Sequence, residues 1–182
     1  MGFRIEDGSG NGHSAKVNTD NQFFTLATTV DKQHFFNHDK AEVYSVIVAK
    51  TPTGAGDCFL YIKNNSEVDL NISSIRGRSA SAESIQVKIK DSGTPVGGSA
   101  NSPVNRNAGS ANTADLTVLD GVDITGLSGG SLLDLLYLGT TQYKYEWRSD
   151  IIIPKNQTLS LYAVTGAVAI DITLTAYFGC QG

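Results

Sequence analysis

The sequence predicts an all-β fold: an antiparallel β-sandwich of the jelly-roll type with an extended N-terminal arm. From the mid-forties onward, apolar and polar residues alternate with period two, as in strands that bury one face. Turn-forming residues separate these stretches at short intervals. Only residues 131–138 are a helix candidate, and they are too few for their period to distinguish a helix from a strand.

The elements follow in order along the chain. Residues 1–40 lack a long alternation and hold several polar turns, so we expect an N-terminal arm with a small hairpin at Asp20-Asn21. Residues 41–182 are expected to form the sandwich body. Residues 94–113 are rich in Gly, Ser, Asn and Pro, which predicts a long surface loop. Strands are predicted at 43–50, 58–63, 68–73, 85–90, 116–119, 122–125, 143–148, 159–164 and 168–178.

Composition excludes some classes of function. The 182 residues carry 14 Lys+Arg and 18 Asp+Glu, and the net charge of −4 argues against nucleic-acid binding. The most apolar stretch, 168–178, is interrupted by Asp171 and is too short for a membrane span. No apolar stretch of signal-peptide length opens the sequence. Cys58 and Cys180 form no CxxC pair, and we expect buried free thiols.

Three motifs suggest catalysis or ligand binding, and each is incomplete. Residues 126–130 match the GxSxG elbow, but all three histidines precede Ser128, whereas the hydrolase order places the catalytic His after the Ser. The Gly-rich residues 8–16 lack the spacing of a phosphate loop. His34 and His38 could share a metal site, yet no third firm ligand is evident. We therefore expect no enzyme activity, no cofactor and no metal.

An aromatic row is predicted on one side of the strand at 143–148. Tyr143, Tyr145 and Trp147 alternate there with charged residues. Exposed, such a row could stack on sugar rings; facing inward, it would be part of the core. We favour the inward orientation, because the charged residues already supply a solvated face.

Three stretches resemble segments of small virion structural proteins of tailed bacteriophages. They are the opening DGSGNGHSAKV at 7–17, the mid-chain PVNRNAGSANTA at 103–114 and the strand, Pro-turn, strand pattern IIIPKNQTL at 151–159. The resemblance implies a structural role in the virion, which is assembled in the host cytoplasm. Proteins of this group include capsid decoration (cement) proteins and neck or tail components, and many are homotrimers with a β-sandwich body.

The resemblance leads to a hypothesis in which the arm binds the major capsid protein or other virion proteins. Apolar anchors suited to pockets or strand addition occur along the arm. The candidate capsid or oligomer interface residues are Phe3, Ile5, Phe23, Phe24, Phe35 and Phe36. Two alternatives stay open: a neck, tail or baseplate component, and a host-attachment module that binds glycans through loops such as 97–109.

Overall fold

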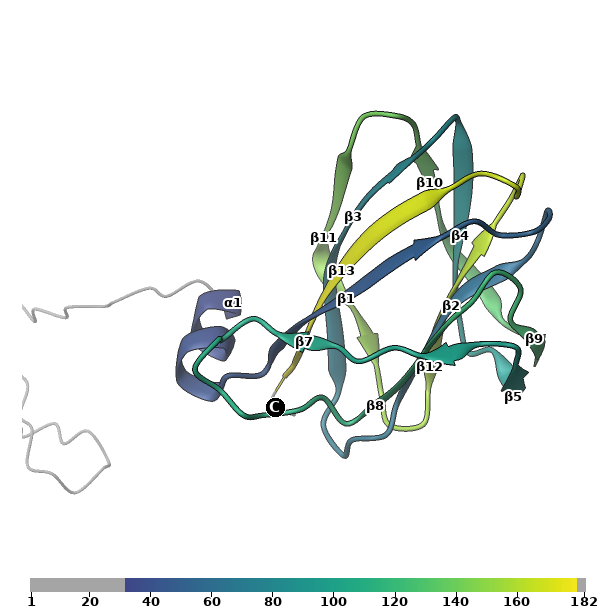
Figure 1. Ribbon diagram of the computed structural model, residues 1–182. Coiled ribbons are helices and arrows are strands. Elements are labelled where there is room, and N and C mark those ends of the chain that lie inside the picture. Colours follow the sequence, from purple (N-terminus) through teal and green to yellow (C-terminus); the bar gives the residue numbers. More distant parts are fainter. Residues whose placement is uncertain (1–31, 180–182) are drawn as a thin grey trace, which may run out of the picture. The chain divides into compact units, whose positions relative to one another are not determined.

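The computed structural model describes residues 32–179, which fold mainly into antiparallel strands (Figure 1). A short α-helix, α1 (Lys32–Phe35), and a π-helical turn, η1 (Phe36–Lys40), precede the first strand. The strands are β1 (Val43–Lys50), β2 (Cys58–Asn64), β3 (Leu70–Ser79), β4 (Glu83–Ile89), β5 (Ser92–Val96), β6 (Ser99–Ala100), β7 (Val104–Asn105), β8 (Leu116–Asp120), β9 (Thr125–Ser128), β10 (Ser131–Leu138), β11 (Tyr143–Ile153), β12 (Thr158–Ala163) and β13 (Ile170–Phe178).

The strands form two main sheets, so the predicted antiparallel β-sandwich is confirmed. One sheet has the order β11-β3-β13-β1-β7, and the other has the order β10-β4-β12-β2-β8-β6. Strands distant in sequence lie side by side: β13, near the end of the chain, pairs with both β1 and β3 (Figure 1). At one side of the sandwich, β10 and β11 are the terminal strands of their sheets.

The long segment between β4 and β10 extends the sandwich at the opposite side. Its strand β7 pairs with β1 in one sheet, and its strand β8 pairs with β2 in the other. Strands β5 and β9 of the same segment form a separate two-stranded ribbon. The residues predicted as one loop, 94–113, therefore include the short strands β6 and β7 and the end of β5.

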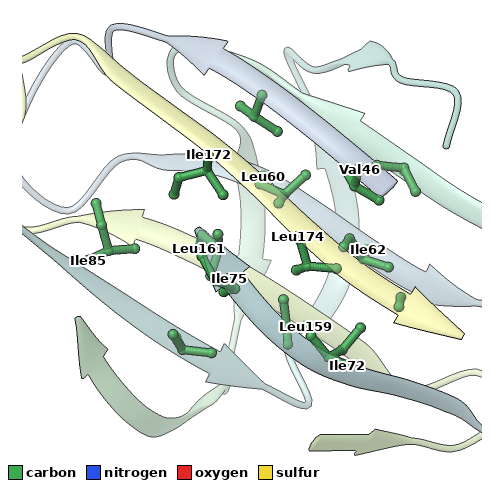
Figure 2. Close-up of a cluster of buried hydrophobic side chains, with 14 of the residues drawn as sticks. Val46, Leu60, Ile62, Ile72, Ile75, Ile85, Leu159, Leu161, Ile172 and Leu174 are labelled. Atoms are coloured by element: carbon green, nitrogen blue, oxygen red, sulfur yellow. The ribbon is translucent and has the colours of Figure 1, made fainter. Parts of the chain in front are cut away.

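The core lies between the two sheets, where period-two alternation places every second side chain (Figure 2). The inward residues are mostly aliphatic and buried, as close packing of two sheets requires. From the first sheet they include Ile72, Ile75 and Leu174, and from the second Leu60, Leu159 and Leu161.

A buried carboxylate fastens the β12–β13 loop to β4. Glu83 is 3% exposed, and its two oxygens accept the backbone N–H groups of Ser84 (2.8 Å), Thr165 (2.8 Å) and Gly166 (2.9 Å). Gly166 has a φ of 73°, and a Cβ built there would lie 2.1 Å from the Gly54 backbone. Both the left-handed backbone and the close approach require glycine.

The structure contradicts one predicted strand and decides the conformation of a segment that the sequence left ambiguous. The predicted strand at 122–125 is wrong: residues 121–124 turn along β2, where the Ile124 N–H bonds to the Cys58 carbonyl at 2.7 Å, and strand β9 begins only at Thr125. The ambiguous residues 131–138 form strand β10, because pairing with β4 turns Leu136 and Leu138 into the core.

Candidate functional site

The base of the N-terminal segment, which is formed by α1 and η1, packs on the sandwich. Phe36 is 6% exposed, and its ring stacks on that of Tyr177 in β13 with 5.0 Å between the centroids. Phe35 makes an edge contact with Phe36 at 5.4 Å but remains 38% exposed. The compact unit that contains the sandwich accordingly begins at Lys32 rather than at residue 41. Of the predicted interface residues, Phe36 is used inside the body and Phe35 lies on its surface.

The other predicted interface residues, Phe3, Ile5, Phe23 and Phe24, lie outside the described residues. The Asp20-Asn21 hairpin and Cys180 also lie outside them.

Three asparagines of the long β4–β10 segment hold the end of η1. The side-chain amide of Asn105 donates to the Ala41 carbonyl at 2.8 Å, and that of Asn107 donates to the Asn37 carbonyl at 3.0 Å. Asn112 donates to the carbonyl of the last η1 residue at 3.3 Å. A helical turn leaves its final carbonyls without partners in the chain that follows, and these amides supply them. The base of the N-terminal segment is therefore fixed to the body by hydrogen bonds as well as by Phe36.

The aromatic row of β11 spans the side of the sandwich where both sheets end. The Tyr145 hydroxyl accepts the Tyr137 backbone N–H at 3.0 Å and donates to the Tyr137 carbonyl at 2.5 Å. The Trp147 indole N–H donates to the Asp134 carboxylate at 3.1 Å. Tyr145 and Trp147 thus connect β11 of one sheet to β10 of the other, and both pack against the main core.

The prediction that the whole row is buried is wrong for Tyr143, which is 57% exposed. It occupies the first position of β11, next to the turn that follows β10, where the neighbouring sheet no longer covers it. Beside Trp147 the two sheets leave a pocket of about 620 Å³, which is lined mainly by aliphatic residues together with the carboxylates of Asp134 and Asp150. That volume is within the range of small-ligand sites.

The GxSxG match does not form a nucleophile elbow. Ser128 ends strand β9, and its carbonyl accepts the Ser92 hydroxyl at 3.0 Å across the β5–β9 ribbon. An elbow places its Ser between a strand and a helix, whereas strand β10 follows here. The GxSxG residues therefore belong to the two-stranded β5–β9 ribbon and the turn that follows it.

The described residues include His34, His38 and Cys58, which sequence analysis considered as metal ligands or as a nucleophile. His34 and His38 stack with 5.6 Å between ring centroids, and no group of three or more His, Cys, Asp or Glu side chains within residues 32–179 is placed to hold a metal. Cys58 is a buried free thiol, as predicted. Burial raises the pKa of the Cys58 thiol to about 12, so the thiol stays protonated at neutral pH.

Comparisons with known proteins show no relative: no family model, no curated protein and no solved structure matches the chain. Among the described residues, no helix has the length and apolar character needed to cross a membrane.

Proposed function

We propose that this chain is a non-enzymatic structural protein of a bacteriophage virion. In this proposal it is a capsid decoration (cement) protein that binds and stabilises the lattice of the major capsid protein through its N-terminal segment. The three phage-like stretches support the virion assignment. Successive strands β1 to β4 alternate between the two sheets, which supports a jelly-roll body.

The fixed base of the N-terminal segment is the observation that carries the proposal. If the N-terminal segment binds the capsid shell, it keeps the sandwich there only when residues 32–40 stay packed on the sandwich. Phe36 and the three asparagines provide that attachment at η1. Residues before Lys32 supply the apolar anchors Phe3, Ile5, Phe23 and Phe24.

The energetics of such binding favour an oligomer. Ordering one residue costs about 1–2 kcal/mol, while burying one large apolar side chain contributes about 1.5–3 kcal/mol. Four such anchors offset the ordering of only a few residues, so in this proposal backbone hydrogen bonds to the shell and several linked copies contribute as well. We propose a homo-oligomer, with a trimer favoured, located in the virion.

Co-sedimentation with empty capsids tests the proposal. The full-length chain with Phe23→Ser and Phe24→Ser should lose most of its capsid binding, because both anchors become polar. Val164→Ser is the matched control, since Val164 is an exposed apolar residue of the body. Capsid binding that is undiminished in the double variant would contradict the role of the segment.

The pocket beside Trp147 favours a glycan-binding host-attachment module as the second candidate function. An indole and a carboxylate at one pocket could contact a sugar ring and its hydroxyls. A glycan array with the purified protein distinguishes the two functions. Specific binding that Trp147→Ala removes would favour the attachment module, and the absence of binding would favour the structural protein.

A further inference from the structure

Exposed apolar side chains gather on the side of the sandwich formed by β10 and β11. Of the eleven large hydrophobic residues exposed in the described part of the chain, five lie on these two strands. We call them the β10–β11 patch: Leu132 (57% exposed), Leu133 (45%), Tyr137 (64%), Tyr143 (57%) and Ile152 (56%). Leu133 and Ile152 both line the pocket beside Trp147, so an exposed apolar residue of each sheet lies where β10 and β11 meet. We infer that the β10–β11 patch is the surface through which copies of this chain associate.

Addition of a partner strand to β10 is hindered by the chain itself. The Tyr137 N–H and carbonyl are occupied by the Tyr145 hydroxyl, and the Leu135 N–H donates to the Asp134 carboxylate at 2.8 Å. An edge whose backbone groups are satisfied in this way is a poor template for another strand. Contact between copies at β10 therefore uses side chains of the patch rather than strand addition, and this favours a closed oligomer over an open run of sheets paired through β10.

The size of the patch agrees with a second copy as the occupant. Two tyrosines that are more than half exposed and three aliphatic residues near half exposure present roughly 500 Å² of apolar surface. A standard interface buries about 800 Å² from each partner, and about 65% of a homodimer interface is apolar. The patch supplies about that apolar share.

The distribution of charge supports the same occupant. All five side chains of the patch are uncharged, and the Asp134 carboxylate beside them already accepts the Trp147 indole N–H. The exposed ion pair of Lys144 and Glu146 lies on the same strand as Tyr143. An apolar centre with charged residues beside it is the usual arrangement of a protein interface.

This inference rests on the oligomer in the proposed function and is tested separately from capsid binding. Sedimentation velocity of the full-length chain should give a mass that is a small multiple of 19.3 kDa. The variant Leu132→Lys with Tyr137→Lys should sediment as a monomer, because it places two positive charges in each copy of the contact. Ile47→Lys with Val96→Lys is the matched control, since both residues are exposed and lie on other strands. The control should remain oligomeric.

A photo-crosslinking amino acid gives a second measurement that does not depend on disrupting the interface. Placed at Tyr137 it should link two copies, and placed at Ile47 it should not. A monomeric wild-type protein, an oligomer that the patch variant preserves, or crosslinking at Ile47 alone would overturn the inference. An oligomer that behaves as expected but fails to sediment with capsids would instead contradict the proposed function.

Discussion

Replacing Phe36 tests whether the base of the N-terminal segment belongs to the body. The Phe36 ring is buried against Tyr177. At 25 cal/mol per Å², burying about 150 Å² of aromatic surface contributes about 4 kcal/mol, and Phe→Ala changes in cores cost about 3–5 kcal/mol. Phe36→Ala should therefore weaken the docking of residues 32–42 by about 3 kcal/mol. Phe35→Ala, at a more exposed ring, should cost less than about 1 kcal/mol.

Hydrogen exchange of the Glu42 amide measures this docking directly, because the Glu42 N–H bonds to the Phe36 carbonyl at 3.0 Å. A loss of about 3 kcal/mol corresponds to exchange that is roughly 100-fold faster. Amides of the central strand β3 should keep their protection in both variants. Equal acceleration by Phe35→Ala and Phe36→Ala, or no acceleration by Phe36→Ala, would show that Phe36 does not hold residues 32–42 on the sandwich.

Four other outcomes are expected. Glu83→Ala should lower the free energy of unfolding by roughly 2–4 kcal/mol, measured by chemical denaturation, because it leaves three backbone N–H groups without their buried acceptor. Tyr145→Phe should increase light scattering on storage, because the backbone of Tyr137 becomes an open edge. The Cys58 thiol should resist modification at neutral pH until the chain is denatured, and the stability contributed by its neutral form, complete below pH 9.0, should decline as the pH rises toward about 12. Ser128→Ala should leave the rate of ester hydrolysis by the purified protein unchanged.

Matched controls accompany these measurements. Glu67→Ala removes an exposed carboxylate and should leave stability within about 0.5 kcal/mol. Tyr143→Phe removes an exposed hydroxyl from the same strand as Tyr145 and should not increase scattering. A Cys180→Ser background restricts thiol modification to Cys58. A loss below about 1 kcal/mol for Glu83→Ala, equal scattering by the two tyrosine variants, rapid modification of the native thiol, or ester hydrolysis that Ser128→Ala removes would each contradict its prediction.

The strands of the sandwich were largely predictable from local pattern. The alternation at 168–178 predicts β13, and the predicted strand at 43–50 has the same bounds as β1. Both strands lie within the first sheet, where one face packs on the core and period two is directly expressed. Burial of one face is the physical reason why these predictions succeed.

Long-range contacts decided what the sequence pattern left open. Residues 131–138 become a strand because β4 pairs with them, and Phe36 is buried because Tyr177 of the last strand lies beside it. The hydrogen bond from Asn107 to Asn37 joins residues 70 positions apart. An asparagine-rich stretch indicates a polar loop, but its spacing carries no information on a partner so distant in sequence.

Cryo-electron microscopy of the intact particle would show where this chain lies and which proteins its N-terminal residues contact. We expect the β-sandwich on the outer surface of the shell, the β10–β11 patch facing another copy, and the residues before Lys32 in contact with the major capsid protein. A particle in which the sandwich is bound but the residues before Lys32 touch no shell protein would contradict the proposed role of the N-terminal segment.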